Sequence, residues 1–467
     1  MAEAMKTPAS ELPDRVSWPM IFAYGTPGTG AGYMYLMLAL YVMKFATDVL
    51  LIAPAIMGII FSASRIWDAV SDPVVGYLSD RTKTAYGRRR TWIAASCLPI
   101  GATFVMVFAP PESLSDTELV IWMAVAIIGF YSAMTVFFVP HLSLGAELSS
   151  SYHERSRLFG IRHGFYTFGS ILSLISFYLL ISAEQEGREV VRAEAFDLAL
   201  LAAGVMVVLI LVSVGRLKER PDYQGRVNNN PFQAFRDVWR NPHARLLIVV
   251  SFIEQVGSAA IGVLTLYVTQ YVVGAPLWAP VIILCYMIPS SLSVPLWLPL
   301  SRRFGKVRLW MFSMLLTGFS FGAMFALPFL DSVELKIFYI CFFAVTAGLA
   351  AGCGGTLSPS IQGDVIDYDE MVTGERKEGS YFAAWNFVYK GATGVMMLLT
   401  GFVLQFAGFV PNQDQTMTVQ VSMVTLYGIF PLVCYIIGAA LFTRFKLDET
   451  EHAKIRKVLD KRAAAGG

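Results

Sequence analysis

The stretch SRIWDAVSDP, residues 64–73, places three ionisable side chains in a segment that is otherwise apolar. Asp68 and Asp72 are four residues apart, so in a helix their carboxylates lie one turn apart on one face, which Arg65 shares. Two buried carboxylates this close repel each other, and a bound cation or proton relieves the repulsion. Oxygen ligands suit a hard cation such as Na⁺, and Ser71 adds a hydroxyl from the neighbouring turn. The pattern predicts a cation site; the alternative is a structural clamp in which Arg65 neutralises one carboxylate.

The chain around this stretch has the composition of a membrane protein. Of its 467 residues, 55% are hydrophobic and 15% are charged, whereas an average soluble domain has about 25% charged residues. The apolar residues form repeated blocks of about 20, which is the length of helix that crosses a hydrocarbon layer of about 30 Å. The cysteines occur singly, without the spacing of a metal site or disulfide framework. We predict an all-α polytopic protein of the cell membrane, the inner membrane if the source is bacterial.

Apolar runs and polar breaks predict twelve transmembrane helices. Their ranges are 20–44, 52–79, 92–109, 119–143, 157–182, 197–215, 246–273, 277–300, 308–329, 335–360, 380–408 and 418–444. Alternate loops contain 20 Lys and Arg residues against four in the opposite loops. Because positively charged loops stay in the cytoplasm, both termini are predicted to be cytoplasmic.

The longest internal loop divides the predicted helices into two groups. The predicted parts are a cytoplasmic tail (1–19), a six-helix bundle (20–215), a cytoplasmic central loop (216–245), a second six-helix bundle (246–444) and a cytoplasmic tail (445–467). GYLSDRTKTAYGRRR after the second span and PLSRRFGKVR after the eighth form a weak repeat between the bundles. This organisation predicts the major facilitator fold of an alternating-access transporter.

Few other ionisable residues lie deep in the predicted spans, where a charge costs about 2.5–3.5 kcal/mol or more. Lys390, in the eleventh span, is expected to pair with the aspartates across the bundle interface until a cation displaces it. The alternative is a lysine that snorkels to the cytoplasmic surface. Glu254, in the seventh span, is a candidate for contact with substrate or for a hydrogen bond to a neighbouring helix.

The first span is predicted to carry no charge, because Lys44 is assigned to the following loop. Its four glycines and Pro27 favour tight packing or local bending. His141 and His163 are candidates for the cavity or a gate, with structural roles as the alternative.

The segment GDVIDYDE, residues 363–370, ends the tenth span at the predicted cytoplasmic surface. Asp364 and Asp367 in this segment, together with Asp80 after the second span, are candidates for ion pairs that close a cytoplasmic gate. The alternative is a solvated charged cap.

Three motifs give the chain a resemblance to a known family. RIWDAVSDPVVGYLSDRT…YGRRRTWI, VPHLSLGAEL…HERSRL and GDVIDYDE…GER…EGSYFAAWNFVYKGA resemble motifs of the glycoside–pentoside–hexuronide:cation symporter family, in the same order. The resemblance covers all twelve predicted spans. It implies that Asp68 and Asp72 bind the coupling cation, that Thr135 is a further cation ligand, and that Lys390 matches a lysine of the family. It also places Arg162 near the sugar, although the alignment can slip by one residue to His163.

The sequence departs from the melibiose/sodium symporter of this family at three positions. Gly32 and Phe138 stand where that symporter has sugar-binding aspartates, and Ser71 stands where it has an asparagine. A site for sugar hydroxyls needs acceptors, so the cavity is expected to be more apolar than a galactoside site. Related sodium-dependent lysophospholipid transporters have the same aspartate pair and lysine with an apolar cavity.

The sequence therefore predicts a secondary active transporter that couples Na⁺ or H⁺ to symport of a small organic solute, by family a sugar or glycoside. Trp385, Asn386 and Tyr389 are further candidates for the cavity lining. The alternatives are a more apolar substrate, such as a lysophospholipid, and a non-transporting membrane receptor. We expect no enzymatic activity, no cofactor and no nucleic-acid partner. The expected partners are the solute, a monovalent cation and the lipid bilayer, and the expected functional unit is a monomer.

Overall fold

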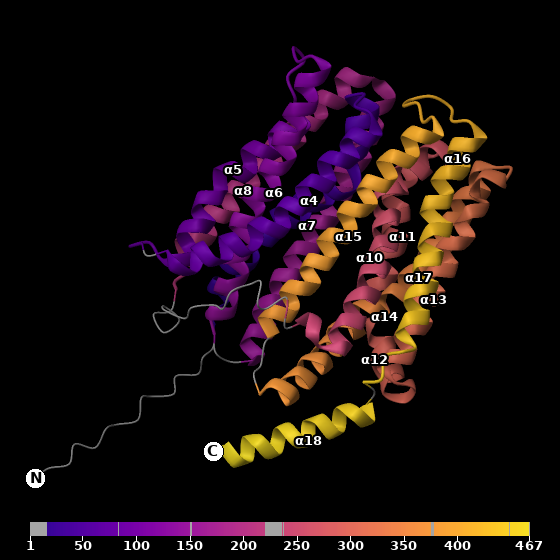
Figure 1. The fold of residues 1–467 in the computed structure, drawn as a ribbon. Helices are drawn as coiled ribbons and strands as arrows, with labels where there is room; N and C mark the ends of the chain where they lie inside the picture. The colour runs from indigo at the N-terminus through magenta and orange to yellow at the C-terminus, as the bar shows by residue number, and fades with distance from the viewer. Residues whose placement is uncertain are drawn as a thin grey trace, which may run out of the picture.

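The computed structural model describes residues 16–82, 84–149, 152–219, 236, 238–374, 378–447 and 449–466. Within these ranges the regular structure is helical, without a β-strand. Helices of the first part of the chain pack together in what is here called the N-terminal half (Figure 1). They are α1 (Trp18–Gly25), α2 (Pro27–Leu36), η1 (Met37–Tyr41), α3 (Val42–Lys44), η2 (Phe45–Val49), α4 (Pro54–Arg81), α5 (Arg88–Phe108), α6 (Asp116–Glu147), α7 (Tyr152–Glu186) and α8 (Arg188–Arg216).

The C-terminal half contains the helices from α10 to α17, and a last helix, α18, follows it. These elements are α10 (Pro242–Val268), η4 (Thr269–Val273), η5 (Pro276–Trp278), α11 (Ala279–Leu292), α12 (Val294–Phe304), α13 (Lys306–Ala323), η6 (Met324–Phe329), α14 (Val333–Thr373), α15 (Glu378–Ala407), α16 (Met417–Val424), η7 (Thr425–Ile429), α17 (Phe430–Phe442) and α18 (Glu449–Gly466). Most of the predicted central loop, residues 220–235 and 237, lies outside the described residues, as do residues 1–15 of the N-terminal tail.

Nine helices in the described part of the chain are long and apolar enough to cross a membrane. A tenth crossing is obtained when the pair Pro276–Leu292 and Val294–Phe304, bent by 50°, is counted as one span. The other two predicted spans correspond to α1–η2 and α4. The first is divided into short helical segments, and the second carries the ionisable residues from Arg65 to Arg81. These interruptions and charges separate the two segments from the other ten spans, whose apolar stretches are longer or carry fewer charges.

The first span continues further than the sequence predicts. α-Helical and π-helical segments follow one another from Trp18 to Val49, with a π-helical turn at η1 and another at η2. Lys44 and Asp48 therefore lie within the helical run, so the predictions that Lys44 is in a loop and that the first span is uncharged are wrong. The run ends at Leu51, whose φ of 59° is in the left-handed region that bulky residues rarely adopt.

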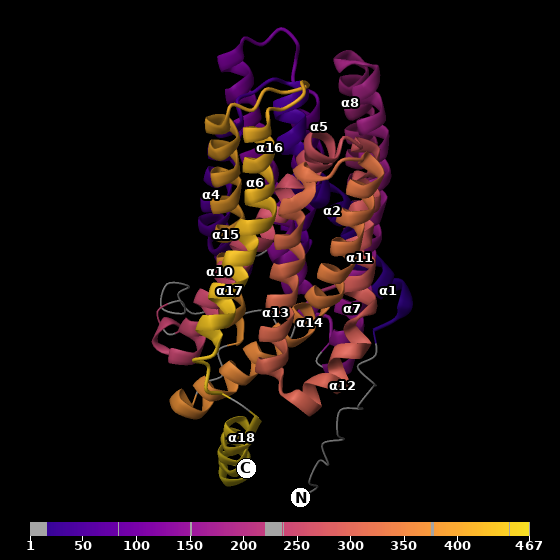
Figure 2. The same cartoon turned by 90° about the vertical axis from the view of Figure 1, so that its right-hand side faces the viewer.

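Helices α4 and α15 run side by side along the boundary between the two halves (Figures 1 and 2). This pairing brings α4, which carries the aspartates, against α15, which carries Lys390. The next element on the N-terminal side is α6, which also packs on α4. The residues of the predicted cation site therefore meet where three helices from both halves converge.

Helices α2 and α7 pack so closely that glycine is required at their contact. A Cβ atom at Gly32 would overlap the carbonyl oxygen of Tyr166, and a Cβ at Gly169 would overlap the carbonyl oxygen of Thr29. The glycines of the first span therefore serve tight packing, one of the two roles expected for them. The same contact leaves no room at Gly32 for a carboxylate side chain.

The predicted C-terminal tail contains a well-formed helix. α18 lies at one end of the molecule, near the ends of α12 and α14 (Figures 1 and 2). His452 of α18 is 3.0 Å from Oδ2 of Asp367, and Arg456 is 3.4 Å from the same oxygen. We call this end of the molecule the α18 end and the opposite end the outer end.

Candidate functional site

The aspartate pair, a threonine and a lysine meet between the two halves. The Nζ atom of Lys390 is 2.6 Å from Oδ2 of Asp72 and 3.4 Å from Oδ2 of Asp68. Thr135 of α6 donates its hydroxyl hydrogen to Oδ1 of Asp72 at 2.8 Å. The contact of Lys390 with the aspartates across the interface is as predicted, and the snorkelling alternative is not what the structure has.

Arg65 contributes a second positive charge beside the pair. Its Nη1 is 3.4 Å from Oδ2 of Asp68, and its guanidinium carbon lies 3.7 Å from the centre of the Tyr131 ring. A guanidinium over an aromatic face is stabilised by the ring's negative π surface, so Arg65 is held by Tyr131 as well as by Asp68. The positive charges of Arg65 and Lys390 thus balance the two carboxylates. The contact of Arg65 with Asp68 that was the alternative to a cation site is present together with the contacts of Lys390.

The pair retains unused acceptor capacity. Oδ1 of Asp68 is buried and accepts no hydrogen bond from the described residues, which is unusual because buried polar atoms are normally satisfied. Asp68 is 1% exposed. The Ser71 hydroxyl instead donates to the backbone carbonyl of Asp68 at 3.4 Å, within its own helix. Asp68, Asp72 and Thr135 therefore have oxygen atoms that could bind a cation. The Ser71 hydroxyl donates to a backbone carbonyl and not to the carboxylates.

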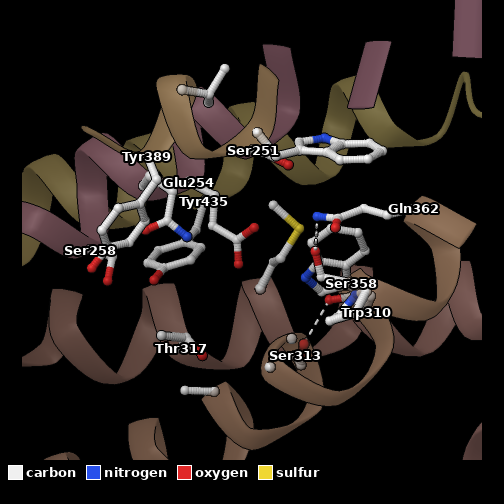
Figure 3. A pocket seen from close by; sticks show the side chains of 18 of the residues that line it. Ser251, Glu254, Ser258, Trp310, Ser313, Thr317, Ser358, Gln362, Tyr389 and Tyr435 are labelled. Carbon is white, nitrogen blue, oxygen red and sulfur yellow. Dashed lines mark hydrogen bonds between the residues drawn. The ribbon is translucent and has the colours of Figure 1, made fainter. Parts of the chain in front are cut away.

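A cavity of about 370 Å³ lies within the C-terminal half (Figure 3). Helices α10, α11, α13, α14, α15 and α17 contribute its walls. Its hydroxyl, amide and carboxylate side chains are Ser251, Glu254, Gln255, Ser258, Tyr286, Ser313, Thr317, Ser358, Gln362, Asn386, Tyr389 and Tyr435. The expectation of a mostly apolar cavity does not fit this lining, because it was based on two positions of the N-terminal half.

Glu254 lies in this cavity with no described Lys, Arg or His within ion-pair distance. A Cβ atom at Gly354 would be 3.6 Å from its Oε1 and 3.3 Å from Nε1 of Trp310, so the carboxylate and the indole face the same space. Trp310 is 1% exposed and Trp385 is 7% exposed. The indole N–H of Trp310 faces the Glu254 carboxylate, and that of Trp385 has no hydrogen-bond partner among the described residues. The cavity therefore combines an acceptor with donors that a bound solute can satisfy.

The predicted lining residues of α15 are brought to the cavity. Trp385, Asn386 and Tyr389 all line it, and Lys390 follows Tyr389 directly in the sequence. Helix α15 thus contributes both a wall of the cavity and the Lys390 ammonium that pairs with the two aspartates.

The predicted residues of the N-terminal half lie apart from this cavity. The guanidinium carbon of Arg162 is 5.8 Å from the centre of the Phe138 ring. His163 is exposed, and its ring is stacked 6.5 Å from that of Tyr166. None of these side chains lines the cavity of the C-terminal half.

His141 is 1% exposed and stacks on Tyr24 at 4.5 Å and on Phe137 at 4.8 Å. Its Nε2 is 3.0 Å from the carbonyl oxygen of Tyr24. These contacts are those of a structural residue that joins α1 to α6, which is the alternative expected for it.

The predicted gate residues form ion pairs within their own halves. Asp80 pairs with Arg89 in the N-terminal half. Asp364 is 2.8 Å from Nζ of Lys306 in the C-terminal half, and Asp367 contacts α18. For Asp80 and Asp364, no ion pair across the two halves occurs among the described residues.

One charged cluster was missed by the sequence reasoning. Lys44, Asp48 and Glu184 meet at the outer end, with Lys44 bonded to Glu184 and 3.3 Å from Oδ2 of Asp48. The available signal was the apolar run VLLIAP directly after Asp48, which favours continuation of the span beyond Lys44.

Comparison with known proteins decides the family. The sequence description of the MFS/sugar transport protein family matches residues 23–449. The chain belongs to this family. The isoprimeverose transporter of Lactiplantibacillus pentosus is 26% identical over 463 residues, which cover 98% of this chain and 94% of that protein. The sodium-dependent lysophosphatidylcholine symporter 1 of Xenopus tropicalis is 25% identical over 467 aligned residues, covering 90% of this chain and 86% of that protein.

The fold is also shared with solved transporters. The crystal structure of a D-xylose-proton symporter matches with a TM-score of 0.66 at 13% identity, covering 90% of this chain and 96% of that one. The resemblance predicted from the three motifs is confirmed. The chain is a multi-pass membrane transporter and not an enzyme, and it is a cation-coupled symporter of the major facilitator type.

Proposed function

We propose that the coupling cation binds at Asp68 and Asp72 and displaces Lys390. The observation that carries this proposal is the contact of the Lys390 ammonium with both carboxylates across the boundary between the halves. An intramolecular cation occupies the position that a free cation would take. Thr135 supplies a third oxygen, because its hydroxyl already lies 2.8 Å from Asp72.

This exchange couples the ion to the movement of the halves. When Lys390 holds the pair, it ties α15 to α4. When a free ion neutralises the aspartates, this tie is released and α15 can move with the cavity wall that it carries. A ligand shifts the balance between two conformations only by its different affinity for each, and the competition between ion and lysine provides such a difference. Arg65, held on Tyr131, keeps one further charge beside the site in both states.

The solute that suits the cavity is a sugar or glycoside. Hydroxyl groups both donate and accept hydrogen bonds, so they can satisfy the Glu254 carboxylate and the unpartnered indole N–H of Trp385 together. Asn386 and Tyr389 add polar contacts from α15. The name of the Lactiplantibacillus relative supports a sugar substrate. A lysophospholipid tail would leave these buried polar groups unsatisfied, which disfavours the more apolar alternative.

Arg162 and His163 are proposed to contact the solute on the N-terminal side of its pathway. On that side Phe138 stands where the melibiose/sodium symporter has a carboxylate. The proposed topology has twelve crossings, which adds α1–η2 and α4 to the ten apolar spans, and has both termini in the cytoplasm. The positive loops support this orientation. The proposed functional unit is a monomer, and the proposed ion is Na⁺ or H⁺.

Uptake into proteoliposomes tests this function. Labelled sugars, glycosides and lysophosphatidylcholine are offered with an imposed Na⁺ gradient, an imposed pH gradient or neither. We expect accumulation of a hydroxyl-rich solute only when one of the two gradients is present. Binding of a solute without any accumulation would instead support a receptor, and accumulation of the lysophospholipid alone would refute the proposed substrate class.

A further inference from the structure

The cluster at the outer end is a set of buried charges that the proposed coupling mechanism does not use. Lys44 and Asp48 are each 1% exposed. Lys44 bonds to Glu184 of α7 and lies 3.3 Å from Asp48, so two carboxylates surround one ammonium. Tyr41 donates its hydroxyl hydrogen to Oε1 of Glu184 at 2.8 Å. All four of these residues belong to the N-terminal half.

Three further hydrogen bonds join this cluster to the C-terminal half. The hydroxyls of Thr47 and Tyr267 are 2.7 Å apart. Tyr271 donates to Oδ2 of Asp48 at 2.6 Å. Asn412 donates from its Nδ2 to the backbone carbonyl of Asp48 at 2.7 Å. The contacts come from α10 and η4, which form one continuous span, and from the connection between α15 and α16, so two separate segments of one half converge on two neighbouring residues of the other.

The backbone around these contacts is held in unusual conformations. Asn412 has a φ of 60°, and asparagine is among the few residues other than glycine that adopt this region readily. Its backbone N–H also donates to the hydroxyl of Tyr271 at 3.1 Å. Thr47 and Asp48 lie in the π-helical turn η2, and such turns occur often at functional sites. The backbone therefore has a special conformation on both sides of this contact, at η2 in the N-terminal half and at Asn412 in the C-terminal half.

The two kinds of contact respond differently when the halves separate at this end. The bonds of Lys44 and Tyr41 to Glu184 lie inside one half and can persist. The bonds of Tyr267, Tyr271 and Asn412 must break, and water must replace them at Asp48. In the structure Thr47 and Tyr267 are completely buried, so this end is closed.

We propose that Thr47 and Asp48 form an outer latch with Tyr267, Tyr271 and Asn412, which holds the halves together at the outer end. Lys44 and Glu184 are positioning residues, because Glu184 holds the Lys44 ammonium and that ammonium lies 3.3 Å from Oδ2 of Asp48, the oxygen that accepts from Tyr271. The latch contacts stabilise the conformation in which the outer end is closed. This proposal rests on the proposed function, in which the two halves move apart alternately at the two ends. Cation binding at the aspartate pair and opening of the latch are separate events at separate residues.

Labelling of a cysteine at the outer end tests the latch. Leu40 is 9% exposed, and its Cδ2 would be 3.5 Å from a Cβ atom at Gly262 of the other half. Leu40→Cys is introduced into a chain whose five native cysteines are replaced by alanine and whose folding is verified by thermal denaturation. A membrane-impermeant maleimide then reports how often the outer end opens.

Tyr271→Phe removes only the hydroxyl that crosses the halves, and it is expected to raise the labelling rate about tenfold, as the loss of a hydrogen bond to a charged group predicts. Tyr41→Phe is the matched control, because it removes a hydroxyl from the same cluster within one half, and it is expected to leave the rate within about twofold of the parent.

An unchanged rate in Tyr271→Phe would overturn the proposal, and so would an equal rise in both variants, since the cluster would then only stabilise the N-terminal half. The readout does not require a known solute. Loss of ion-coupled uptake in variants of the aspartate pair therefore remains a distinct result.

Discussion

Replacement of Lys390 by alanine separates the two roles that its ammonium would have, as a counter-charge and as a competitor of the ion. The ammonium is 22% exposed and lies 2.6 Å from a carboxylate oxygen of Asp72. A hydrogen bond to a charged group contributes about 1.5–3 kcal/mol. Because about 1.4 kcal/mol corresponds to a factor of ten in a binding constant, the ion should bind the variant about 10- to 100-fold more tightly.

Tighter ion binding should be accompanied by a loss of net transport. Without Lys390 the empty site has two carboxylates and only Arg65 to balance them, so one negative charge remains uncompensated. Burial of an unpaired charge is costly, which should prevent the empty carrier from changing conformation. Exchange of solute across the membrane with the ion bound needs no such empty step.

Three measurements check this prediction. Ion affinity is measured by thermal shift during titration with NaCl at constant ionic strength, and in parallel by titration with acid. Net uptake and solute exchange are measured in proteoliposomes. The expected result for Lys390→Ala is higher ion affinity, no net uptake and retained exchange. Lys454→Ala, in the exposed part of α18, is the matched control and should resemble the parent. Unchanged ion affinity together with unchanged net uptake in Lys390→Ala would refute the displacement mechanism.

Three other changes give sharp expectations. Thr135→Val removes the hydroxyl that bonds Asp72 and should lower ion affinity about tenfold, whereas Thr135→Ser should retain it; equal affinities in the two variants would exclude Thr135 as a ligand. Glu254→Gln should raise the KM for solute at least about tenfold by loss of a charged acceptor with ion affinity unchanged, and an unaltered KM would remove Glu254 from the solute site. Gly32→Ala should destabilise the protein by about 1–3 kcal/mol in thermal denaturation, since overpacking costs this much. Gly164→Ala on α7, with no atom within 4 Å of the added Cβ, should be neutral or stabilising, and equal effects would contradict the close packing.

The contact of Asp68 and Asp72 with Lys390 could be predicted because charge inside a membrane is so costly that each ion needs a partner. The helical period placed both carboxylates on one face, and the only basic residue of the eleventh span had no other obvious counter-charge. The extent of the helices followed in the same way from the apolar runs, with boundaries that differ by a few residues from α6 and α15. The prediction for α8 was less accurate, because this helix begins at Arg188 and not at residue 197.

The outer latch could not be predicted by the same reasoning, because its ions lie where an apolar run appears to stop. Lys44 was assigned to a loop. Only the fold brings Glu184 of α7 to Lys44, and Tyr271 of η4 and Asn412 to Asp48, so that both residues are buried. The direction of the Ser71 hydroxyl is likewise a choice among rotamers that the sequence does not specify. The polar cavity was not predicted because its walls come from six helices of one half, and single positions were compared only in the other half.

The central claim is that the aspartate pair binds the ion that drives uptake. Asp72→Asn tests it most directly, because it removes one charge, keeps the size of the side chain and leaves an oxygen that can accept the bond from Thr135. Solute uptake by this variant is measured in proteoliposomes with and without the ion gradient that drives the parent. We predict that the gradient no longer increases uptake, although solute exchange persists. Gradient-driven accumulation equal to that of the parent would contradict the claim.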